Sequence, residues 1–109
     1  MKALLIVSVL GLAALPSAQS TQTVAGVITD DMCAKDGHET MRMGPNDAEC
    51  TKACVSAHGA EYVLADGKNI YTLSDQKTPE KFAGQRVRVT GTLNTKTRAI
   101  QVQSMSPAK

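Results

Sequence analysis

The chain has 109 residues with 12 basic and 10 acidic side chains, which gives a formal net charge of +2. Such a balance does not produce the strong positive field that attracts nucleic acid or anionic lipid. Its only aromatic residues are Tyr62, Tyr71 and Phe82, too few for a platform on which bases stack. We therefore expect no nucleic-acid partner.

The first 20 residues have the organisation of a secretory signal peptide. Lys2 provides a charged start, an apolar run follows over residues 3–15, and Ala18 and Ser20 are the small residues that a signal peptidase requires. The apolar run is too short to span a bilayer comfortably, and no second one follows it. We expect a chain without a membrane span that works in the periplasm or is secreted.

The remaining residues are enough for one small domain, which we place at residues 21–105 with a short tail at 106–109. A domain of this size buries only about 60–65% of its unfolded surface, so it often needs a covalent or metal staple. We find no internal repeat and expect a monomer.

The first predicted strand covers residues 21–29, where both faces are largely apolar and Gly26 permits a bend. Residues 30–58 then form a polar insertion that holds all the cysteines and histidines. A loop carries Cys33 to Pro45, and a helix follows it, with Asn46 or Asp47 as the N-cap and Gly59 after its last turn.

The helix repeats small and thiol side chains at i, i+3, i+4 and i+7, beginning at Cys50 and including Cys54. Both cysteines are therefore expected on its buried face. Thr51, Lys52 and Ser56 are expected to point elsewhere.

Four more strands are predicted after the helix. Residues 61–65 and 68–73 form a hairpin at Asp66-Gly67, a pair that favours a tight turn in which both central residues have positive φ. A short helical turn at residues 78–84 precedes the last hairpin. In that hairpin the buried side chains alternate with polar ones: Val87, Val89, Gly91, Leu93, Ile100 and Val102.

This order of elements is that of an OB-fold. We predict a mainly β protein, a small five-stranded OB-like barrel with a Cys/His-bearing loop and helix inserted between strands 1 and 2. A five-stranded β-roll of another topology is the alternative, because periodicity does not give strand order. The insertion would then enlarge one of the two loops with which OB-folds bind ligands.

A family resemblance is carried by residues 26–33, His38, residues 49–55 and residues 59–64. They read G-x-I-x-D-x-x-C, a histidine, E-C-T-x-x-C-V and G-A-x-Y-V-L. The pattern resembles a family of small exported bacterial proteins of uncharacterised function. More distantly, and in topology only, the chain is similar to periplasmic OB-fold proteins linked to envelope stress. Neither resemblance implies an activity or a site.

A disulfide is one interpretation of the cysteines. Exported proteins usually oxidise their cysteines, so Cys33 would pair with Cys50 or Cys54 and tie the loop to the helix. Closing such a loop would contribute about 3 kcal/mol in the chain-entropy model. A bridge between Cys50 and Cys54 is also conceivable, and any of these pairings leaves one thiol over.

A metal site is the other interpretation, and the odd thiol keeps it open. Cys33, His38, Cys50 and Cys54 form a candidate Cys₃His set, with two ligands from the helix and two from the loop. Thiolates suit zinc and Cu(I) alike, so we expect zinc or copper, and no cofactor if the cysteines are oxidised. His58 is too far along the helix to share an ion with Cys50. It could serve Cys54 or hold the helix C-terminus, where a cation is favoured, and we prefer the second role.

Two methionines near His38 bear on the choice of metal. Met41 and Met43 favour copper within the metal interpretation, because thioethers are soft ligands. Met also fills irregular gaps in apolar cores, and that packing role is the commoner one.

No arrangement typical of an enzyme is present. The chain has no C-x-x-C redox motif and no nucleophile elbow, and the adjacent Asp30 and Asp31 fit a turn, or contact with His38, better than acid–base catalysis. We predict that the protein is not an enzyme. The leading hypothesis is an exported small binding protein for zinc or copper. The alternative is a metal-free, disulfide-stapled module for an unknown envelope protein.

Overall fold

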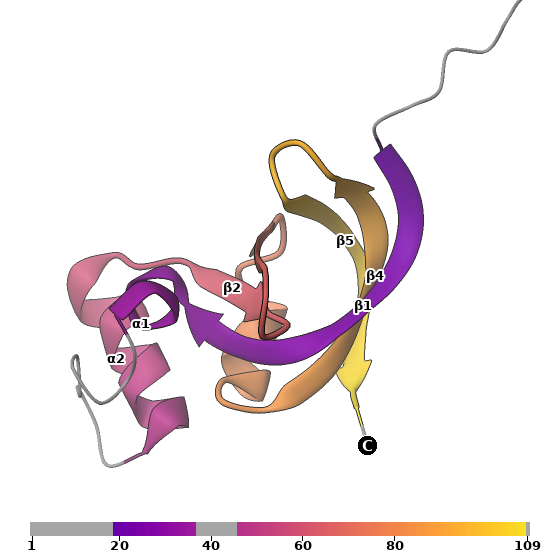
Figure 1. The fold of residues 1–109 in the computed structure, drawn as a ribbon. Coiled ribbons are helices and arrows are strands. Elements are labelled where there is room, and N and C mark those ends of the chain that lie inside the picture. The colour runs from indigo at the N-terminus through magenta and orange to yellow at the C-terminus, as the bar shows by residue number, and fades with distance from the viewer. Residues whose placement is uncertain (1–18, 37–45, 109) are drawn as a thin grey trace, which may run out of the picture.

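The computed structural model describes residues 19–36 and 46–108. Five strands close into a barrel in the order β1-β2-β3-β5-β4, and β3 and β5 run parallel while the other neighbours are antiparallel. The strands are β1 (Gln19–Asp30), β2 (Tyr62–Ala65), β3 (Ile70–Leu73), β4 (Arg86–Asn94) and β5 (Ala99–Pro107). This order confirms the predicted OB-like barrel (Figure 1).

The long strand β1 holds the barrel closed because it pairs on both sides. Its first part pairs with β4 from Gln19 to Val27, and its last part pairs with β2 from Val27 to Asp30. Gly26 lies where the strand passes from one partner to the other. A Cβ at this position would come within 2.6 Å of the Ala65 carbonyl oxygen, so the close approach requires glycine.

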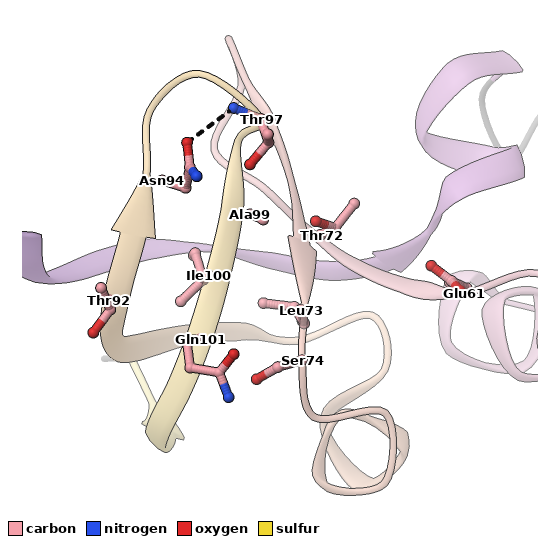
Figure 2. Close-up of a pocket in the computed structure, with 10 residues that line it drawn as sticks. All are labelled: Glu61, Thr72, Leu73, Ser74, Thr92, Asn94, Thr97, Ala99, Ile100 and Gln101. Carbon is pink, nitrogen blue, oxygen red and sulfur yellow. Dashed lines mark hydrogen bonds between the residues drawn. The ribbon is translucent and has the colours of Figure 1, made fainter. Parts of the chain in front are cut away.

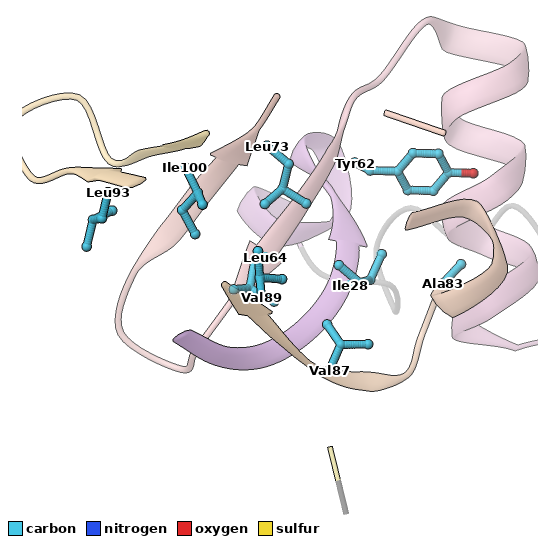
Figure 3. Close-up of a cluster of buried hydrophobic side chains, with 9 residues drawn as sticks. All are labelled: Ile28, Tyr62, Leu64, Leu73, Ala83, Val87, Val89, Leu93 and Ile100. Carbon is cyan, nitrogen blue, oxygen red and sulfur yellow. The ribbon is translucent and has the colours of Figure 1, made fainter. Parts of the chain in front are cut away.

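The barrel core is one cluster of buried side chains contributed by all five strands and by Ala83 (Figure 3). The predicted alternation in β4 is confirmed, since Val87 and Val89 are buried whereas Arg86 and Arg88 are exposed. The full set of buried core residues is Ile28, Tyr62, Leu64, Leu73, Ala83, Val87, Val89, Leu93 and Ile100.

The described part of the insertion between β1 and β2 contains two helices, α1 (Asp31–Asp36) and α2 (Asp47–His58). They lie at one end of the molecule, beyond the end of β1 and away from the β4–β5 loop (Figure 1). The loop predicted from Cys33 onward therefore begins as a helix. A six-residue helix is too short to show a helical period in sequence. A 3-10 helix, η1 (Thr78–Phe82), connects β3 to β4 as expected.

The β2–β3 turn differs from the prediction. Four residues, 66–69, separate the paired Ala65 and Ile70, and of these only Gly67 has a positive φ. The Asp66 carboxylate accepts hydrogen bonds from the backbone N–H groups of Lys68 and Asn69 at 2.8 and 2.6 Å. This side-chain-stabilised loop replaces the tight turn with two positive φ angles.

The strand ends also extend beyond their predicted positions. Strand β1 begins at Gln19, and β5 continues to Pro107, which pairs with Val87. None of the helices that the structure describes is long and apolar enough to cross a membrane.

Candidate metal centre

Helix α2 is capped at both ends. The Asn46 side chain accepts a hydrogen bond from the backbone N–H of Glu49 at 2.9 Å, and Gly59 ends the helix in the left-handed conformation at φ 68°. Both caps agree with the sequence prediction. Because Cys50 and Cys54 are four positions apart, the two thiols lie one turn apart on the same side of the helix, and both are buried.

The buried face of α2 is broader than predicted. Thr51 was expected to point away from it, but its side chain is fully buried. Helix α2 packs on two sides, since Val55 contacts both the barrel core and the cysteine cluster, and Ala48 contacts the barrel core. The Thr51 hydroxyl has no hydrogen-bond partner among the described residues.

Helix α1 brings the third thiol to the other two. The Cys33 Sγ atom lies 3.6 Å from Cys50 Sγ and 3.8 Å from Cys54 Sγ, and all three sulfurs lie within 4.8 Å of one another. The three residues are 3%, 1% and 0% exposed. We call Cys33, Cys50 and Cys54 the cysteine cluster.

The sulfur separations are those of a ligand set and not of a bond. None of the three cysteines is in a disulfide, and 3.6 Å is far longer than the roughly 2.05 Å of such a bond. Two sulfurs bound to one tetrahedral zinc ion, at Zn–S distances of about 2.3 Å, lie about 3.8 Å apart. The cysteine cluster could therefore hold a metal ion.

Asp30 is the structural residue that places Cys33. Its carboxylate, which is fully buried, accepts a hydrogen bond from the backbone N–H of Cys33 at 3.0 Å and so caps α1. The second oxygen, Oδ1, has no hydrogen-bond partner among the described residues. Sequence reasoning gave Asp30 a turn role or a contact with His38, and it did not foresee the burial of Asp30. The available signal was an acid three residues before a cysteine, at a strand end.

Burial and negative charge dominate the electrostatics of the cluster. Burial raises the pKa of the Cys33 thiol, and hydrogen bonding with Asp30 raises it further. Burial also raises the pKa of Cys54, and the charge of Asp30 acts in the same direction. The thiols of Cys33 and Cys54 are thus held in their neutral form until an ion displaces the protons.

The predicted ligand set is brought together in part. Cys33, Cys50 and Cys54 converge, whereas His38 lies outside the described residues, as do Met41 and Met43. His58 is the exposed last residue of α2 and is not in the cysteine cluster.

A separate cavity of about 530 Å³ lies on the barrel, lined chiefly by residues of β3, β4 and β5 (Figure 2). Its lining is rich in hydroxyl and amide groups, among them Thr72, Ser74, Thr92 and Gln101. Some are already engaged, since the Ser74 hydroxyl accepts a hydrogen bond from the backbone N–H of Val102 at 2.8 Å. The lining includes none of the three cysteines.

Comparison with known proteins gives one match. No curated protein and no solved structure is significantly similar to the chain. The matching segment begins at Val55, so it takes in the end of α2 and the barrel from β2 to β5, and the cysteine cluster precedes it. Over residues 55–108 the chain matches a family described as a protein of unknown function (DUF5818).

Proposed function

We propose that this protein is an exported small binding protein that takes up a soft metal ion, zinc or copper, through Cys33, Cys50 and Cys54. The observation that carries the proposal is the convergence of three buried sulfurs from two helices at 3.6 and 3.8 Å from Cys33. Thiolates are the preferred ligands of zinc and Cu(I). His38 remains our candidate for a fourth ligand, on its spacing from Cys33.

The arrangement supports binding rather than catalysis. Structural metal sites have closed, fully buried ligand sets, whereas catalytic sites keep a position open to substrate. All three cluster residues are buried, and the cavity of about 530 Å³ lies elsewhere on the barrel. We therefore infer a role in holding an ion, in the periplasm or outside the cell, without turnover of a substrate.

A second candidate function has its own support. Cys33 lies close enough to both Cys50 and Cys54 that a small side-chain rotation and oxidation would form a disulfide. The protein would then be a metal-free, stapled module whose polar cavity between β3, β4 and β5 faces an envelope partner.

The mass of the natively purified protein separates the two functions. The chain is isolated from the periplasm of an expressing bacterium without chelator, and intact mass, thiol count and metal content are measured together. Stoichiometric zinc or copper with three reduced cysteines supports the metal-binding function. A mass two units below the reduced chain, with one titratable thiol and no metal, supports the stapled module.

A Cys54→Ser variant sharpens the result, with His58→Ala as the matched control from the same helix. Loss of metal in the first and retention in the second are expected. Full metal content in Cys54→Ser, with the fold intact, would overturn the cluster as the binding site.

A further inference from the structure

The cysteine cluster has a buried, negatively charged neighbour, Asp30. The carboxylate of Asp30 is fully buried beside Cys33, and one of its oxygens is without a hydrogen-bond partner in the described part of the chain. Besides burial, the charge of Asp30 raises the pKa of both Cys33 and Cys54. Lys52, on the same helix as Cys50, faces solvent and pairs with Glu49 at 3.9 Å.

The net charge of the filled site therefore decides which ion it accepts. Three thiolates contribute three negative charges, so a monovalent ion leaves a net charge of −2, a divalent ion leaves −1, and a trivalent centre leaves none. Burying an uncompensated charge is costly, and the cost grows when a like charge is close. A neutral product fits this site best.

The number of donor atoms also favours a trivalent centre. Among the described residues the group of mutually close ligand atoms has three members, all sulfur and all buried. Trivalent arsenic forms three bonds to sulfur and carries a lone pair where a fourth ligand would stand. It needs no further donor.

We propose that the cysteine cluster binds a trivalent, thiophilic metalloid of the arsenite class. This inference rests on the proposed function, because it assigns a ligand class to the same site. In the reaction, the three As–O bonds of arsenous acid, As(OH)₃, break and three As–S bonds form. Each thiol proton leaves with a hydroxide as water, and arsenic stays trivalent, so no oxidant or reductant takes part.

Asp30 becomes a specificity-determining residue in this proposal. The Asp30 carboxylate lies beside a filled site whose net charge is zero with arsenic, −1 with zinc and −2 with Cu(I). Its repulsion therefore grows in that order. If each unit of charge costs about tenfold in affinity at this range, Asp30→Asn raises zinc affinity about tenfold and Cu(I) affinity about a hundredfold. Arsenite affinity changes by less than about twofold. The amide oxygen of Asn can still accept the Cys33 N–H bond that caps α1.

The test is titration of the reduced full chain with arsenite, zinc and Cu(I) in turn, followed by native mass spectrometry. The expected result is one arsenic per chain, with a mass gain of one arsenic less three hydrogens. Arsenite is also expected to displace bound zinc. Cys54→Ser abolishes the tris-thiolate adduct, and the exposed control His58→Ala retains it.

The outcomes separate this inference from the proposed function. A chain that binds zinc or Cu(I) at the cysteine cluster but forms no arsenic adduct overturns the inference and leaves the proposed function standing. A chain with reduced cysteines that binds none of the three overturns both. Equal effects of Asp30→Asn on all three affinities overturn the role of Asp30. If that variant does not fold, the zinc-displacement experiment on the unaltered chain decides the ligand class.

Discussion

Cys33 and Cys50 lie 17 positions apart in sequence, yet their sulfur atoms are 3.6 Å from each other. The contact joins α1 to α2 at the end of β1, where the barrel meets the insertion. An ion bound there would cross-link the two helices in the folded state only. Metal binding should therefore increase the free energy of unfolding, which can be measured.

Zinc is expected to raise the melting temperature of the reduced chain. A ligand that binds the folded state alone stabilises it by about 2.7 kcal/mol at a hundredfold excess over its Kd. Thermal unfolding followed by circular dichroism with and without zinc gives the shift. Chelator should reverse it, and Cys50→Ser should show no shift. An equal shift in Cys50→Ser would place the zinc elsewhere.

Leu64→Ala is expected to destabilise the barrel by about 2–5 kcal/mol, because Leu64 is fully buried in the core and its removal leaves a cavity. Ile70→Ala is the matched control, since Ile70 is 40% exposed on the adjacent strand β3, and a change within about 0.5 kcal/mol is expected. Urea denaturation of both variants measures the difference. Similar losses in the two variants would contradict the arrangement of β2 and β3.

Gly26→Ala tests the close approach of β1 to β2. A Cβ at residue 26 would meet the backbone of Ala65, which cannot move aside as a side chain could, so a loss of about 1–3 kcal/mol or more is expected. Gly67→Ala has open space around it and is strained only by its positive φ, which costs about 1 kcal/mol. Chemical denaturation of the pair should rank Gly26→Ala as the more damaging, and the reverse order would argue against the register of β1 and β2.

Asn46→Ala should destabilise α2 by about 1 kcal/mol, because the backbone N–H of Glu49 loses its acceptor. Asn46→Asp keeps an acceptor of the same size and should stay close to the unaltered chain. The readout is protection of α2 amides from hydrogen exchange. Equal protection in all three proteins would show that Asn46 does not cap the helix.

Asp75 contributes to stability in a pH-dependent manner. Hydrogen bonds from the side chain and backbone of Thr78, and then from the backbone of Lys77, hold the pKa of Asp75 below its ordinary value. A group with a lowered folded-state pKa stabilises the fold above its unfolded pKa, near 3.9, and this contribution is lost as pH falls through the folded value. The stability difference between the unaltered chain and Asp75→Asn should be constant above about pH 5 and shrink below pH 4. A difference independent of pH down to pH 2 would refute it.

The barrel was accessible from sequence because its elements carry strong local signals. Val87 and Val89 alternate with arginines in β4, and Asn46 and Gly59 mark the two ends of α2. These signals depend on residues a few positions apart, so neighbouring positions are enough to find them. The same reasoning placed Cys50 and Cys54 on one face of a helix.

The missed features depend on tertiary context. Thr51 is buried because α2 packs on two sides, which one helical stripe does not reveal. The meeting of Cys33 with the helix thiols requires α1, and α1 depends on a cap from the buried Asp30. Asp66 stabilises its loop through its own side chain, which overrides the dipeptide preference for a tight turn.

The pairing of β1 with β4 has a consequence for the time course of folding. Thr21 pairs with Thr92, so the barrel cannot close until nearly the whole chain is present. Folds with such distant contacts form slowly, because the entropy of loop closure is lost before the contacts are gained. In a chain that crosses a membrane N-terminus first, Cys33, Cys50 and Cys54 arrive before β4 and meet the oxidants of the new compartment as exposed thiols. If the chain is exported, as we propose, disulfide formation would then compete with burial of the cysteine cluster.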